Sequence, residues 1–125
     1  YTLYPVPGAG GATIAGLTVT SAAGGWGADK EIIAAAAIAA DFWVCAADVD
    51  TFAGGVIQPV VGMIEIAAAT EVFSFRFDPT AVTTNMGRFG VPVPRFIPGG
   101  SQITAKISGA AIRTLNVSVL VATGL

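Results

Sequence analysis

Short runs of alternating apolar and polar residues, separated by glycine and proline, dominate the chain after residue 12. The segment EVFSFRF at 71–77 places its three phenylalanines on one face, because successive side chains of a strand point to opposite sides of the sheet. The segments QITAKIS at 102–108 and TLNVSVLVA at 114–122 alternate in the same way. Such runs between turn residues predict β-strands with one buried face.

The segment VPVPRFIPGG at 91–100 contains three prolines. Proline has no backbone N–H to donate, so this segment predicts an edge strand or an extended crossing, followed by a tight PGG turn. The segment PVVGMIEIA at 59–67 predicts a more buried strand, and ATIAGLTVT at 12–20 is rich in β-branched residues.

The stretch EIIAAAAIAADFWVCA at 31–46 has two interpretations. Alanine is the best helix former, so propensity favours a helix. The surrounding strands and the strand-prone Phe42, Trp43 and Val44 favour two strands with a bend near 37–41. A membrane helix needs about 20 apolar residues, and Asp41 interrupts the apolar run long before that length.

Together these segments predict an all-β protein, an antiparallel β-sandwich of about eight strands with a jelly-roll-like arrangement. One domain is expected over 12–125, because no internal repeat or linker divides it. Prolines and glycines predict an extended N-terminal arm over 1–11. The expected strands are 12–20, 30–37, 41–49, 60–67, 71–77, 91–97, 102–108 and 113–122.

Charge is scarce: 11% of residues are charged and 54% are hydrophobic, against a usual charged share of about 25%. Because the apolar runs are too short for membrane helices, burial against protein partners is the better explanation. The net charge of −2 with scattered basic residues argues against nucleic-acid binding. The N-terminus has neither the basic nor the apolar region of a signal peptide.

Partner contacts are expected at the arm, whose apolar and aromatic residues are unusual for a disordered tail. The candidate contact residues are Tyr1, Leu3, Tyr4, Pro5 and Val6.

Few residues are candidates for catalysis or metal binding. The chain has no histidine, which excludes histidine-dependent nucleophilic catalysis and most zinc sites. The single cysteine, Cys45, has apolar neighbours and predicts a buried structural residue. Two carboxylate pairs, Asp48 with Asp50 in a loop and Glu65 with Glu71 flanking another, leave glycoside hydrolysis as a weak alternative. Asp48 and Asp50 also leave calcium binding as a weak alternative. We therefore expect no enzyme activity, no cofactor and no metal site.

Two aromatic residues stand in glycine-flanked turns, Trp26 in GGWGA and Phe89 in GRFGV. Each either caps one end of the core or serves as an exposed recognition residue. Asp48 and Asp50 are expected in a loop. Together with Trp26 and Phe89, they are the candidate residues of an exposed recognition loop.

Four segments carry a resemblance to a known family. They are WGADKEI (26–32), DFWVCAADV (41–49), GMIEIAAATEV (62–72) and VPRFIPGGSQITAKISGAAIRTLNVSVLVA (93–122). On these motifs the chain resembles small jelly-roll virion proteins of tailed bacteriophages. The resemblance implies strands at 30–37 and 41–49, and a role as a capsid decoration or other minor structural protein.

Three functional hypotheses follow. The first is a bacteriophage capsid decoration (cement) protein, located in the virion and assembled in the host cytoplasm. It would form a homo-oligomer, with a trimer favoured, and bind the major capsid protein or another virion protein. The second is a receptor- or glycan-binding module of a fibre or head spike. The third is a glycan-active enzyme or carbohydrate-binding module outside viruses, since jelly rolls host both.

Overall fold

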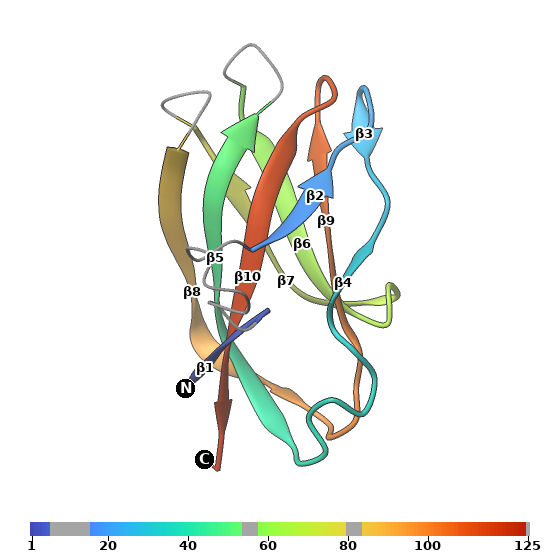
Figure 1. Cartoon of the computed structure of the whole chain (residues 1–125), viewed down its shortest axis with the longest axis vertical. Coiled ribbons are helices and arrows are strands. Elements are labelled where there is room, and N and C mark those ends of the chain that lie inside the picture. Colours follow the sequence, from blue (N-terminus) through green and yellow to red (C-terminus); the bar gives the residue numbers. More distant parts are fainter. Residues whose placement is uncertain (6–15, 54–57, 80–83, 125) are drawn as a thin grey trace, which may run out of the picture.

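The computed structural model describes residues 1–5, 16–53, 58–79 and 84–124, with the backbone alone at 84–86. The described residues form ten strands and no helix. Two antiparallel sheets pack face to face, and their long strands run along the long axis of the molecule (Figure 1). The prediction of an all-β sandwich is confirmed.

The first sheet, sheet A, contains β1 (Thr2–Tyr4), β2 (Leu17–Thr20), β5 (Phe42–Ala53), β8 (Thr84–Ile97) and β10 (Thr114–Thr123). The second, sheet B, contains β3 (Gly25–Trp26), β4 (Lys30–Ile33), β6 (Val60–Ile66), β7 (Thr70–Phe77) and β9 (Ile103–Gly109).

The order of the strands in the two sheets identifies the sandwich as a jelly roll. The order β2-β10-β5-β8 in sheet A faces β4-β9-β6-β7 in sheet B, and all pairings between these strands are antiparallel. This order is the double Greek key of a jelly roll. Ten strands appear where about eight were expected, because the short strands β1 and β3 lie in segments with too many glycines or prolines to predict a strand.

Alternating apolar side chains of both sheets meet in the core. Phe42, Phe52 and Leu115 are completely buried, and so are several isoleucines and valines of the facing strands. Complete burial of each such side chain is worth about 1.5–3 kcal/mol. The phenylalanines of 71–77 share the core-facing side of β7, because Phe73 also packs against the core and its register partner Ile64 is completely buried. Phe75 and Phe77 are buried, whereas Phe73 is only half-buried.

The ambiguous stretch at 31–46 is two strands joined by a turn. β4 ends at Ile33, earlier than expected, and β5 begins at Phe42. The turn between them contains Ala36 with a φ of 66°, and Ile38 anchors it in the core. Asp41 accepts a hydrogen bond of 2.8 Å from the backbone N–H of Gly99, so this turn is joined to the PGG turn.

Strand β8 lies at the edge of sheet A, as its prolines predicted. Its pairing with β5 jumps from Arg95, opposite Val44, to Gly90, opposite Ala46. The residues between, 91–94, contain two of the prolines. The bulge thus sits where the missing N–H groups would break the ladder.

The N-terminal arm is extended where it is described, but it belongs to the sandwich. Residues 2–4 form β1, which pairs antiparallel with β10. Val6 and the rest of the arm to 11 lie outside the described residues. In the part of the chain that the structure covers, no helix is long and apolar enough to cross a membrane.

Candidate functional site

The outer face of sheet A carries an apolar area in its lower half. Trp43 and Cys45 point away from the core, because their neighbours Phe42 and Val44 point into it and are completely buried. Trp43 is paired with Phe96 of β8, and their rings meet edge to face with centroids 5.6 Å apart. Cys45 is half-buried on this face, so the prediction that it lies in the core is wrong.

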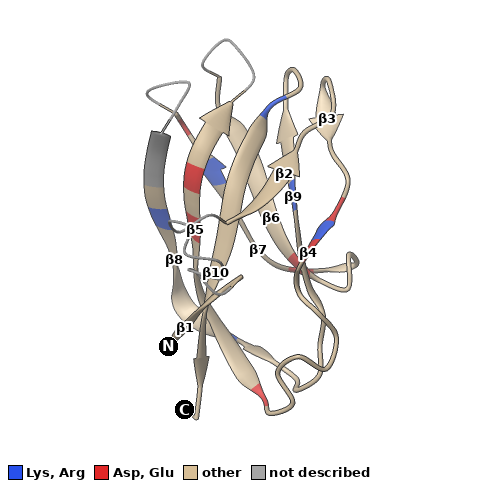
Figure 2. Cartoon of the chain, in the orientation of Figure 1, with Lys and Arg blue, Asp and Glu red and all other residues tan. Residues whose placement is uncertain are grey.

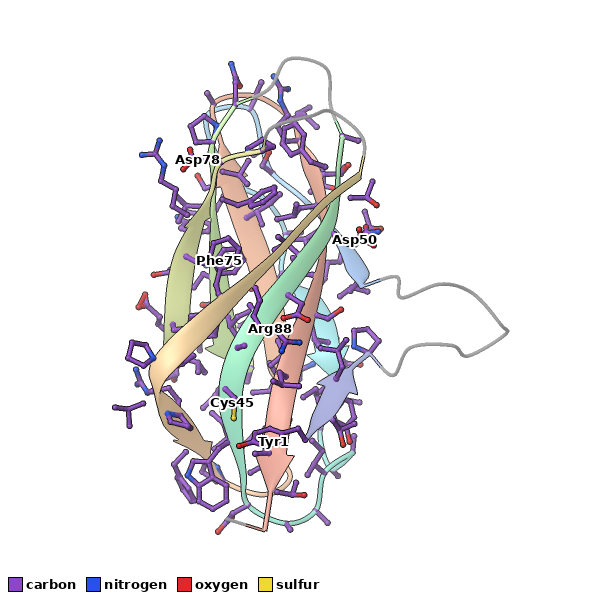
Figure 3. All side chains as sticks on the ribbon, turned by 90° about the vertical axis from the view of Figure 1, so that its left-hand side faces the viewer. Tyr1, Cys45, Asp50, Phe75, Asp78 and Arg88 are labelled. Carbon is purple, nitrogen blue, oxygen red and sulfur yellow. The ribbon has the colours of Figure 1, made fainter. Side chains whose placement is uncertain are left out.

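We call Trp43 and Phe96, together with Val93 three residues earlier on β8, the outer apolar patch. Val93 is 72% exposed and Phe96 54% exposed. Most of the visible lower half of this sheet is uncharged (Figure 2), although the exposed Arg95 directly precedes Phe96 on β8. Tyr1, 84% exposed, lies on the same half of the molecule as Cys45 (Figure 3). Exposed apolar residues that gather in this way are typical of interaction sites.

Charge on sheet A is concentrated higher up, at Asp48 and Arg88. These residues are register partners on β5 and β8, and the guanidinium donates two hydrogen bonds of 2.7 and 2.8 Å to the two carboxylate oxygens. Asp48 raises the pKa of Arg88 through the hydrogen bond and its negative charge. Both oxygens of Asp48 are therefore already engaged by the protein itself.

The calcium alternative at Asp48 and Asp50 gains no support. Both residues lie on β5, so the expectation that they occupy a loop is wrong. Among the described residues, no three or more His, Cys, Asp or Glu side chains are grouped to hold a metal ion.

A second cluster lies on the outer face of sheet B. It consists of Trp26, Asp29, Glu65 and Lys106, which we call the Glu65 cluster. Lys106 on β9 points its ammonium at Oε1 of Glu65, 3.4 Å away, and the same nitrogen lies 5.3 Å from the centre of the Trp26 ring. Glu65 is only 4% exposed, which is unusual for a carboxylate.

Burial is the largest cause that raises the pKa of Glu65. A hydrogen bond with Asp29 and its negative charge raise this pKa further, whereas Lys106 lowers it. Oε1 of Glu65, despite the nearby ammonium, and Oδ1 of Asp29 are buried without a hydrogen-bond partner. Together these effects favour the protonated form of Glu65.

Glycoside hydrolysis gains no support from the carboxylate pairs named from the sequence, because both oxygens of Asp48 already accept hydrogen bonds from Arg88. The other pair considered, Glu65 with Glu71, consists of register partners on β6 and β7. Glu71 is exposed whereas Glu65 is buried, so they have different surroundings.

The remaining predicted site residues divide between surface and core. Trp26 is 41% exposed, on the two-residue strand β3. Phe89 lies on β8 rather than in a turn, and its ring stacks on Phe75 with centroids 4.7 Å apart. Half-buried Phe89 thus packs against the core.

The arm residues also differ in exposure. Tyr1 is exposed, Leu3 and Pro5 are half-buried, and Tyr4 packs against the core. Sequence reasoning missed the Glu65 cluster because Asp29, Glu65 and Lys106 are far apart in the chain. The one available signal was a Glu at an otherwise apolar strand end.

Comparison with known proteins gives no relative: no family model, curated protein or solved structure matches the chain.

Proposed function

We propose that the chain is a non-enzymatic structural subunit that works by binding other protein subunits, as a capsid decoration protein of a tailed bacteriophage does. The observation that carries the proposal is the outer apolar patch, with Val93 and Phe96 exposed on the edge strand β8. The jelly-roll strand order agrees with the family that the sequence resembles, although a fold alone does not define a function.

The patch suits repeated, modest contacts. Burial of Val93 and Phe96 under a partner would stabilise each contact by roughly 1.5–3 kcal/mol per side chain. One such contact is weak after the entropy of association is subtracted. Many copies on a lattice act together, so weak contacts are enough to strengthen a shell.

The proposed partner is the major capsid protein or another virion protein, and the proposed location is the virion after assembly in the host cytoplasm. A homo-oligomer, with a trimer favoured, fits the scarcity of charge. Neither nucleic acid nor a membrane is required.

The test compares Phe96→Ser with a matched control, Ile112→Ser. Ile112 is similarly exposed, at 59%, but lies between β9 and β10 and not on the patch. We expect Phe96→Ser to reduce binding to capsids that lack the protein by about tenfold or more, measured by co-sedimentation, and Ile112→Ser to leave it unchanged. Equal binding by both variants and the unmodified protein would contradict the proposal.

A second function, glycan binding, is favoured by one observation. The exposed ring of Trp26 lies beside the ammonium of Lys106. Sugars stack on aromatic rings and offer hydroxyl donors. A glycan array, followed by a fluorescence titration of Trp26→Ala against the unmodified protein, tests it. Absence of any glycan that loses affinity with Trp26→Ala would exclude this function.

A further inference from the structure

Strands β1 and β2 share one edge of β10. Tyr4, the last residue of β1, is the register partner of Val119, and Leu17, the first of β2, is the partner of Val117. Only Ser118 of β10 lies between these two partners. Along this edge of β10, the pairing with β2 therefore begins two residues away from where the pairing with β1 ends.

The chain between the two strands is much longer than this gap requires. Two residues of a strand span about 7 Å. The connecting residues, 5–16, can reach up to about 40 Å when extended. Among them GAGGA at 8–12 lacks large side chains. The connection is thus long enough to reach the β10 edge of an adjacent molecule.

Where the chain returns to β10, the backbone of Gly16 lies very close to Val117 and Ser118. A Cβ on Gly16 would lie 2.7 Å from the carbonyl carbon and oxygen of Val117 and 2.8 Å from the hydroxyl of Ser118. Glycine at this position lets β2 start directly against β10 without help from β1. The edge next to Val119–Val121 is then a separate three-residue site that any copy of β1 can fill.

We propose that β1 is exchanged between copies of the chain, so that β1 of one molecule pairs with Val119–Val121 of another. This inference rests on the proposed function and names a second copy of the chain as the partner in the assembly. The same backbone pairing and the same packing of Tyr4 form within a molecule or between molecules, so only the connection and the local concentration decide between them.

Concentration controls the exchange. A short tethered strand experiences an effective concentration in the millimolar range from its own chain. In dilute solution β1 therefore stays on its own β10. Where copies are held side by side on a surface, neighbouring edges reach comparable concentrations, and exchange links the copies at no cost in contacts.

Single-cysteine variants test the exchange directly. Leu3 and Leu120 are register partners, so cysteines at these positions are close enough for a disulfide when β1 is seated. Leu3→Cys and Leu120→Cys are prepared separately with Cys45→Ser, mixed at high concentration, unfolded, refolded together and oxidised. We expect a disulfide-linked heterodimer, about tenfold more abundant than with Leu3→Cys and Ile112→Cys as the control mixture.

The double variant Leu3→Cys/Leu120→Cys establishes that the pair can form a disulfide within one chain. If it does so while the mixture gives no more heterodimer than the control, the exchange is wrong. Because the Phe96→Ser experiment does not involve β1, the proposed function can stand when the exchange fails. If Leu120→Cys prevents cooperative unfolding, the adjacent register pair, Thr2→Cys with Val121→Cys, replaces it with the same two outcomes.

Discussion

The carboxylate of Glu65 on β6 and the ammonium of Lys106 on β9 face each other at 3.4 Å on the outer side of sheet B, and the negative charge of Asp29 acts on the same Glu65. Burial and Asp29 outweigh Lys106, so the pKa of Glu65 is raised above its ordinary value of 4.5. The other charged neighbour in register, Glu71 on β7, is a further carboxylate.

The first prediction concerns the pH dependence of stability. A raised pKa means that the folded chain binds the proton of Glu65 more tightly than the unfolded chain. The stabilising contribution is therefore complete below pH 4.5 and is lost as the pH rises through the raised value. Each pKa unit of this difference corresponds to about 1.4 kcal/mol. The Tm of Glu65→Gln relative to the unmodified protein should rise from pH 4 to pH 8.

Other carboxylates also titrate in this range, so the difference between the two proteins is the quantity to follow by circular dichroism. The matched control is Glu71→Gln, which removes an exposed carboxylate next to Glu65. A Tm difference for Glu65→Gln that does not change with pH would show that Glu65 is not protonated preferentially in the folded chain.

The second prediction concerns Gly62 on β6. A Cβ at this position would lie 2.3 Å from the nearest atom of the Phe75 ring, which covers Gly62 from β7. Phe75 also stacks on Phe89, so its ring has little room to move. Gly62→Ala should lower the free energy of unfolding by about 1–3 kcal/mol, measured by denaturant titration.

Gly90 on β8 provides the control for Gly62. Nothing lies within 4 Å of a Cβ built there. Gly90→Ala should change the free energy of unfolding by less than about 0.5 kcal/mol. Equal effects of the two substitutions would mean that the Phe75 ring does not occupy the space above Gly62.

The third prediction separates the two roles considered for Phe89. If it packs against the core, as its contacts with Phe75 and Phe77 indicate, Phe89→Ala removes a supporting ring. The expected loss is about 2–3 kcal/mol of unfolding free energy, below the roughly 3–5 kcal/mol typical of a buried Phe replaced by Ala, because the ring is half-buried. Phe96→Ala, on the outer apolar patch, should cost less than about 1 kcal/mol. The reverse order would place Phe89 at the surface and Phe96 in the core.

The fourth prediction concerns the paired charges of Asp48 and Arg88. The pair is bidentate but lies at the surface, where the arginine side chain is 57% exposed. A double-mutant cycle with Asp48→Asn and Arg88→Gln should give a coupling of about 0.5–1 kcal/mol, because water and salt screen exposed pairs. The coupling should shrink at 1 M salt. A coupling that is unchanged by salt would contradict an exposed ion pair.

The local pattern of alternating residues, prolines and glycines was sufficient to predict much of the fold. Alternation predicted which faces of β9 and β10 enter the core, the prolines predicted that β8 is an edge strand, and Gly99 with Gly100 predicted its closing turn. These features depend on neighbouring residues alone, since the strand period and the missing proline N–H act within a few residues. Aromatic Phe89 was uncertain because flanking glycines suggest a turn, whereas β8 continues through it.

Composition and alternation alone were therefore enough to predict an all-β sandwich with few charged residues and no histidine chemistry. The pairing of β1 with β10, the meeting of Asp29, Glu65 and Lys106 on sheet B, and the contact of Phe96 with Trp43 became visible only in the folded chain. Each of these depends on which distant strands pair and in which register. Bulges such as those in β7 and β8 change that register without a clear local signal, so a pattern read along the chain does not reveal it.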